Sequence, residues 1–167
     1  MMKIIIAPLG GLIGAILGGV LWAKYIQWTG NTAGFVAIGI GLFSGVGMLF
    51  TCSDTIEPNE KKHWLMVSIG AALFALIGIF IGKYLDVQWN AVSEIKKNLM
   101  ANEPDLSDEA ATFIAETQYS GKTKWEHMQD RMDWFDLLFG SIAVVVAFYI
   151  VLNPWVRSIF FKLKRST

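Results

Sequence analysis

Residues 10–48 read GGLIGAILGGVLWAKYIQWTGNTAGFVAIGIGLFSGVGM, and this stretch decides the fold class. It contains most of two long apolar runs, residues 4–25 and 33–52, which are separated by the short polar segment 27–32. Each run has close to the roughly 20 residues that an α-helix needs to cross the hydrocarbon core of a bilayer. Because backbone groups in lipid must satisfy their own hydrogen bonds, both runs are predicted to be transmembrane helices.

Two further apolar runs, residues 64–84 and 135–152, bring the expected number of spans to four. The whole sequence is 54% hydrophobic, which is more apolar surface than a soluble domain of 167 residues can bury. The first run is longer than the apolar core of a signal peptide, and no Ala-x-Ala site follows it, so we expect it to be retained. We therefore predict an all-α membrane protein with four transmembrane helices and a small helical extramembrane segment between spans 3 and 4.

Charge placement predicts the topology. An even number of spans puts both termini on one side, together with several lysines and arginines in short segments. The long segment 86–133 on the other side carries ten acidic residues against five basic ones. Since basic residues near the spans favour the cytoplasmic side, we expect both termini in the cytoplasm, with the inverted topology as the alternative.

The spans divide the chain into four parts. Residues 1–85 hold transmembrane helices 1–3, and residues 86–123 form an extracytoplasmic helical segment. Residues 124–153 are predicted to be one long helix that includes the fourth span, because we see no helix breaker between the capping box at Thr123 and Asn153-Pro154.

Residues 154–167 are a basic amphipathic tail. A helix of this kind next to a span is expected to lie on an anionic membrane surface, although it can also be a simple positive anchor. The residues expected at the lipid surface are Trp155, Arg157, Lys162, Lys164 and Arg165.

Small residues recur every four positions in the first three spans, so each row lies on one helix face where another backbone can approach closely. The signal predicts tight helix packing, either within the four-helix monomer or additionally between protomers. The predicted packing residues are Gly10, Gly11, Gly14, Gly18, Gly19, Gly41, Gly45, Gly78 and Gly82.

Asp136 is the one acidic residue within a span, close to the start of the fourth run. Carboxylates in a membrane are costly and are usually paired or functional. We expect an ion pair with Lys24, Lys83 or Arg131, or exposure to headgroups; the alternative is a carboxylate that binds a proton or a cation.

The remaining polar residues give little indication of a metal-binding or catalytic site. A divalent site from His127, Asp130 and Asp133 is conceivable, but spacings of three drift around a helix, so a solvated charged face is the preferred interpretation.

The single cysteine, Cys52, allows no internal disulfide or thiolate cage. The 14 basic and 14 acidic residues cancel, so nothing in the charge points to nucleic acid. We expect no catalytic residue, no metal and no cofactor.

Residues 10–48, followed by DLLFGSIAVVVAFYI at 136–150, resemble a group of bacterial multi-span proteins. Those proteins share a glycine-rich first hairpin with Trp at its outer end, an Ala-x-Gly-x-Gly second span and an Asp-Leu-Leu-Phe start to the last span. The resemblance implies a bacterial inner membrane and supplies no active-site residue.

The sequence therefore favours a non-catalytic membrane protein that contacts the lipid bilayer and acts as a structural or accessory subunit of a larger complex or homo-oligomer. A homo-oligomeric pore or ion channel is the alternative, and a small transporter using Asp136 is the third candidate.

Overall fold

The computed structural model describes residues 2–30, 35–53, 56 and 60–165, with side chains given from residue 8 to residue 162 of these ranges. Within them the chain forms seven α-helices and no β-strand, which confirms the all-α class. The helices are α1 (Met2–Thr29), α2 (Phe35–Cys52), α3 (Lys61–Asn102), α4 (Asp108–Ser120), α5 (Lys124–Asp130), α6 (Trp134–Leu152) and α7 (Pro154–Arg165).

Four of these helices, α1, α2, α3 and α6, are long and apolar enough to cross a membrane, as predicted. The first residues of the predicted second span, at 33–34, lie outside the described residues, as do parts of the expected connections 27–32 and 53–63.

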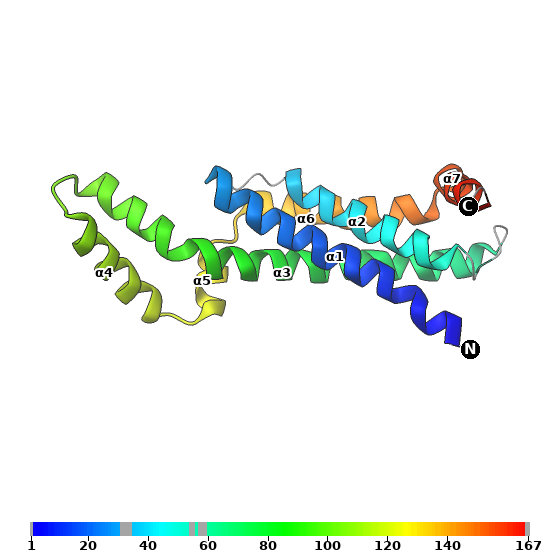
Figure 1. Cartoon of the computed structure of the whole chain (residues 1–167), viewed down its shortest axis with the longest axis horizontal. Coiled ribbons are helices and arrows are strands. Elements are labelled where there is room, and N and C mark those ends of the chain that lie inside the picture. The colour runs from blue at the N-terminus through cyan, green and yellow to red at the C-terminus, as the bar shows by residue number, and fades with distance from the viewer. Residues whose placement is uncertain (1, 31–34, 54–55, 57–59, 166–167) are drawn as a thin grey trace.

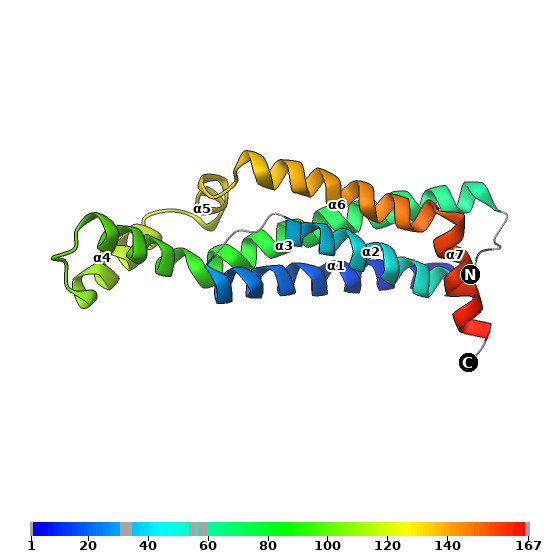
Figure 2. The same cartoon turned by 90° about the horizontal axis from the view of Figure 1, so that it is seen from above.

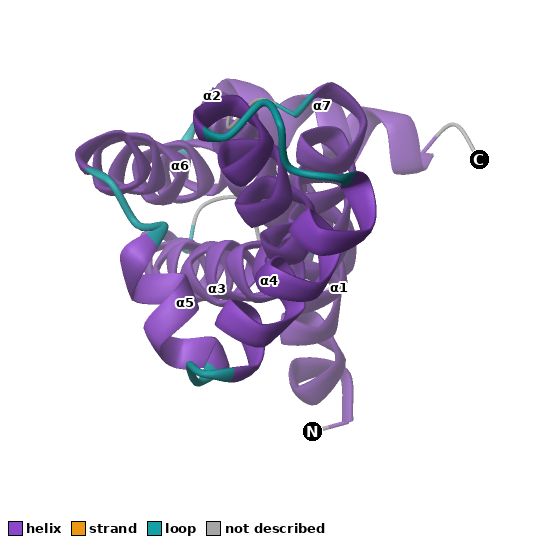
Figure 3. Ribbon diagram, turned by 90° about the vertical axis from the view of Figure 1, so that its left-hand side faces the viewer, coloured by secondary structure: helices purple, strands orange, loops and turns teal. Residues whose placement is uncertain are grey.

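The four long helices form a bundle in which α1 and α6 each pack against both α2 and α3, and α2 also contacts α3 (Figures 1 and 3). Both chain ends lie at one end of the bundle, and α3 projects from the other, which we call the cap end (Figure 1). The last turns of α3, with α4 and α5 packed on them, form a small cap beyond it.

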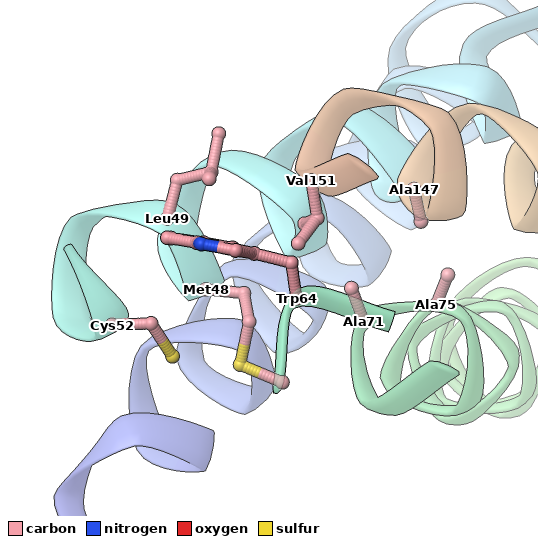
Figure 4. Close-up of a cluster of buried hydrophobic side chains, with 8 residues drawn as sticks. All are labelled: Met48, Leu49, Cys52, Trp64, Ala71, Ala75, Ala147 and Val151. Atoms are coloured by element: carbon pink, nitrogen blue, oxygen red, sulfur yellow. The ribbon is translucent and has the colours of Figure 1, made fainter. Parts of the chain in front are cut away.

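The bundle core at the end that carries the termini is made of apolar side chains from α2, α3 and α6 (Figure 4). Trp64 of α3 is fully buried there, and its ring meets that of Phe161 of α7 edge to face, with centroids 6.1 Å apart. Burying an aromatic side chain of this size contributes a large share of core stability, and the edge-to-face pair adds to it.

Glycines let α1 approach its neighbours closely. A Cβ added at Gly18 would lie 2.8 Å from the Cα of Ile40 in α2, and one at Gly19 would lie 2.5 Å from the carbonyl oxygen of Gly78 in α3. These separations are too short for any residue with a side chain, so glycine is required for helix contact at this distance.

All nine predicted packing glycines face helices of the same chain. Gly10, Gly14 and Gly18 face α2, whereas Gly11, Gly19, Gly78 and Gly82 lie in the contact of α1 and α2 with α3; Gly41 and Gly45 face α6. The wide small-residue face of α1 is thus occupied within the monomer by α2 and α3.

The prediction of one continuous helix over 124–153 is wrong. The helix stops after Asp130 and restarts at Trp134, because Asp133 acts as the N-cap of α6. The Asp133 side chain accepts a hydrogen bond from the backbone N–H of Asp136, whose own carboxylate accepts from the N–H of Asp133. This reciprocal capping box provides acceptors for two backbone N–H groups that would otherwise lack a partner at the start of α6. It therefore begins a new helix, although no Pro or Gly marks the boundary in the sequence.

The helix that runs unbroken from the membrane into the cap is instead α3, with 42 residues. It joins the predicted third span, residues 64–84, to the first part of the predicted extracytoplasmic segment, residues 86–123, without a break. The bundle and the cap therefore share a helix, although not the expected one.

The tail forms α7, which turns away from the axis of α6 and lies across the end of the bundle (Figure 2). Trp155 is 71% exposed, in agreement with a surface position, and Lys162 is also exposed. Arg157 was predicted at the lipid surface, and this is wrong: it is buried, with its guanidinium 4.7 Å from the centre of the Trp64 ring. The side chains of Lys164 and Arg165 lie outside the described residues.

Candidate functional site, a buried charge cluster at the cap end

Charged side chains gather where the bundle meets the cap, and we call this group the charge cluster. Its α3 members follow a spacing of three and four residues, which places them along one helix face. They are joined by one residue from the α5–α6 junction and one from the first turn of α6. The charge cluster consists of Lys83, Asp86, Asn90 and Glu94 of α3, Arg131 of the junction and Asp136 of α6.

Lys83 is the cation at the centre of the charge cluster. Its side chain is only 1% exposed, and its Nζ lies 2.6 Å from Oδ2 of Asp136. It also donates a hydrogen bond of 3.1 Å to the carbonyl oxygen of Arg131, and lies 5.5 Å from the centre of the Trp22 ring. A buried ammonium needs such partners, because desolvating a charge without compensation costs several kcal/mol, on the order of the Born penalty after relaxation.

The helix break supplies one of these partners. Within a continuous helix the Arg131 carbonyl would accept from a backbone N–H four residues later. Because the helix ends there, that oxygen can accept from Lys83 instead. The interruption of the helix and the burial of Lys83 are thus parts of one arrangement.

A second set of contacts joins Arg131 to α3. Asp86 has no exposed surface, and its Oδ2 lies 3.4 Å from Nη2 of Arg131, while Asn90 donates to its Oδ1 at 2.9 Å. Arg131 also forms an ion pair with Glu94. Within the described part of the chain, Asp86 Oδ2 and the indole Nε1 of the buried Trp22 have no hydrogen-bond partner.

The structure brings Asp136 and Lys83 together, whereas the third residue of the predicted group lies elsewhere. Lys24 donates to Gln27 at 2.7 Å and sits 4.6 Å from the centre of the Trp89 ring. Arg131, also considered as a partner of Asp136, pairs with Asp86 and Glu94 instead.

Sequence reasoning missed Asp86, Glu94 and the role of Arg131. The spacing of Lys83, Asp86, Asn90 and Glu94 was a usable signal, because it marks a polar stripe continuing one helix beyond the membrane. The predicted third span ends at residue 84, so the stripe is divided between two expected elements.

The cap itself is held by a smaller set of exposed polar contacts. Thr123 and Glu126 form the predicted capping box of α5, and the backbone and side-chain hydrogen bonds from Thr123 lower the pKa of Glu126 below its ordinary value. Lys122 pairs with Asp130 at 2.6 Å, which raises the pKa of Lys122 and lowers that of Asp130.

The residues considered for a metal have separate structural roles. The His127 ring stacks on Tyr119 with centroids 4.6 Å apart, Asp130 pairs with Lys122, and Asp133 caps α6. Among the described residues no group of three or more His, Cys, Asp or Glu side chains is arranged to hold a metal ion.

In chemical terms, the charge cluster is a set of ion pairs and hydrogen bonds that ties α3, the α5–α6 junction and α6 together. Comparison with protein-family models, with curated proteins and with solved structures finds no match to this chain.

Proposed function

We propose that this chain is a non-catalytic accessory subunit of a membrane complex, which holds a rigid cap at one membrane surface for a partner protein. The observation that carries the proposal is the charge cluster: Lys83 pairs with Asp136, and Arg131 pairs with Asp86 and Glu94. Those contacts fasten the base of the cap to the bundle at two places, so the cap is a fixed platform.

The glycine faces do not serve as the contact surface in this proposal, because helices of the same chain occupy them. The cap offers other surface. Phe113 of α4 is 71% exposed and Trp125 of α5 is 55% exposed. Aromatic residues of this kind are enriched at protein interfaces and often contribute most of the binding energy.

Buried polar groups of the spans support a packing role over a conducting one. Within the bundle, Ser44 donates to the Ala71 carbonyl and Ser68 to the Trp64 carbonyl, each at 2.8 Å. Between these serines and Lys83, the described side chains include no further buried polar one. A pore or transporter would need a polar path across the hydrocarbon region.

As part of the same proposal, the chain sits in a bacterial inner membrane with both termini in the cytoplasm and the cap outside. The acidic character of the cap segment and the resemblance of the spans to bacterial proteins support this placement.

The test is co-purification of the tagged protein at native expression level in mild detergent, followed by native mass spectrometry. We expect a complex with a second protein that is lost in Phe113→Ala and kept in Glu116→Ala, an exposed position on the same helix. A ring containing only this chain, with single-channel steps in a planar bilayer, would overturn the proposal in favour of the pore.

A further inference from the structure

A groove runs between α3 and α6 and ends at the charge cluster. It encloses about 500 Å³, and its walls are almost entirely hydrocarbon. Lys83 and Asp136 stand at the end nearest the cap, and the apolar lining includes Leu76, Ile79, Phe80 and Val144. Since these residues belong to helices that can cross a membrane, the groove opens toward the hydrocarbon region of the bilayer.

The groove exists because α3 and α6 do not close on each other at Gly140. A Cβ added at Gly140 would meet only the Cδ1 of Ile79, at the ordinary contact distance of 3.6 Å. By contrast, a Cβ at Gly78, where α3 faces α1, would lie 2.6 Å from the Ala15 carbonyl oxygen. The missing side chain of Gly140 thus widens the groove between α3 and α6, whereas the missing side chain of Gly78 allows close contact between α3 and α1.

The charges at the head of the groove do not balance. Lys83 and Arg131 are its two cations. Lys83 and Asp136 line the groove and pair with each other, and Arg131, beside them, pairs with Asp86 and Glu94. Among the described residues, the carboxylate of the N-cap Asp133 accepts only from the backbone N–H of Asp136, so these six side chains together carry an excess of two negative charges. Asp133 is exposed at the membrane end of the cap, where a headgroup can reach it.

We propose that this groove binds a phospholipid whose headgroup carries a primary amine. One acyl chain lies between α3 and α6, and the ammonium group donates hydrogen bonds to the carboxylates of Asp133 and Asp136. The apolar walls select a hydrocarbon chain, and the excess negative charge selects a cationic group over an anionic headgroup. This site is separate from the protein-binding surface of the cap, so it does not depend on the proposed function.

The experiment uses the full chain, stripped of lipid in detergent and then offered three lipids with identical acyl chains: phosphatidylethanolamine, phosphatidylcholine and phosphatidylglycerol. Phosphatidylcholine has the same net charge as phosphatidylethanolamine but no N–H donor. Native mass spectrometry counts the lipid molecules retained per chain. We expect one strongly retained phosphatidylethanolamine and weaker retention of the other two, and equal retention of all three would overturn the proposal.

Two variants locate the site. Gly140→Leu fills the groove with a side chain and should abolish the retained lipid. Gly39→Leu is its matched control, because a Cβ at Gly39 meets nothing within 4 Å and the groove stays open. If both variants retain the lipid as well as the unmodified chain, the groove is not the site and the inference fails.

Asp133→Asn tests the headgroup contact without removing the helix cap, because asparagine is as good an N-cap residue as aspartate. We expect the preference for phosphatidylethanolamine over phosphatidylcholine to fall by roughly two- to fivefold, the fold-change that corresponds to one partly exposed charge pair. An unchanged preference, with unchanged helix content by circular dichroism, would contradict the role of the carboxylates.

Discussion

The helices of this bundle are joined by two different kinds of contact. Between α1 and α3 the contact is made by glycines, with Gly19 and Gly78 facing each other backbone to backbone. Between α3 and α6 the helices are farther apart at Gly140, and a buried ion pair of 2.6 Å joins them at the cap end. We call these the glycine contact and the ion-pair contact.

The difference shows how each contact can fail. Helices in lipid gain no hydrophobic free energy by associating, so the glycine contact depends on van der Waals packing and is sensitive to added volume. The ion-pair contact leaves a groove and tolerates volume, but depends on matched charges. It is also the contact that fastens the cap, since Lys83 of α3 holds both Asp136 and the Arg131 carbonyl.

The largest expected effect comes from breaking the ion pair on one side. Lys83→Met leaves the carboxylate of Asp136, which is only 10% exposed, without its cation. Removing one member of a buried pair costs about 3–5 kcal/mol. We expect a loss of this size in the free energy of unfolding, measured by denaturation in mixed detergent micelles.

The double variant Lys83→Met with Asp136→Asn provides the control. Asparagine removes the second charge and keeps an oxygen that can accept from the Asp133 N–H. The double variant should recover most of the lost stability, because no unpaired charge remains. If it is no more stable than Lys83→Met alone, then the packing of the lysine stem, and not the charge pair, stabilises this contact.

A smaller effect distinguishes the two contacts by volume. Gly19→Ala places a methyl group 2.5 Å from the Gly78 carbonyl oxygen, so the backbones must separate. Overpacking of this kind costs typically about 1–3 kcal/mol. The same change at Gly140 puts the methyl group at an ordinary distance, and the better helix propensity of alanine should leave stability unchanged or raise it by up to about 1 kcal/mol.

Both alanine variants are measured by the same detergent unfolding assay, with the unmodified chain as reference. Equal losses of stability at Gly19 and Gly140 would show that the α3–α6 contact is as close as the glycine contact.

The glycine contact could be predicted from the sequence and the ion-pair contact only in part. A row such as Gly10, Gly14 and Gly18 depends only on helical periodicity, so its face is known before any tertiary contact is. Which helix occupies that face depends on the tertiary structure, so the sequence alone leaves packing within the monomer and packing between protomers both open.

The charge cluster depends on a local boundary that the sequence marks weakly. Asp133-Trp-Phe-Asp136 satisfies the logic of a capping box, but it lies within an otherwise helical pattern and has no adjacent Gly or Pro. If residues 124–153 are taken as one continuous helix, the Arg131 carbonyl is bonded to a backbone N–H four residues later, and no hydrogen bond from Lys83 is expected. The pairing of Arg131 with Asp86 is then also hidden, because it joins residues 45 positions apart.

The smallest expected effect compares the glycine contact with the exposed polar contacts of the cap by their response to pH. The pKa values of Glu126 and Asp130 are lowered in the folded chain, by Thr123 and by Lys122 respectively. Acids with lowered folded pKa values stabilise the fold above their unfolded pKa values of about 4, and this contribution is lost as the pH falls through the folded values. Lys122, whose own pKa is raised by Asp130, stays charged throughout this range.

We therefore expect amide hydrogen exchange in α5 to rise as the pH is lowered from about 5 to 3, after correction for the intrinsic exchange rate. Exchange in α1 around Gly19 should not change, because the backbone contact with Gly78 contains no titratable group. Glu126→Gln keeps the capping-box acceptor without its titration, and should remove part of the pH dependence in α5. Equal loosening of α1 and α5 at low pH would mean that acid acts on the bundle and the cap together, and that the glycine contact is as sensitive to pH as the cap.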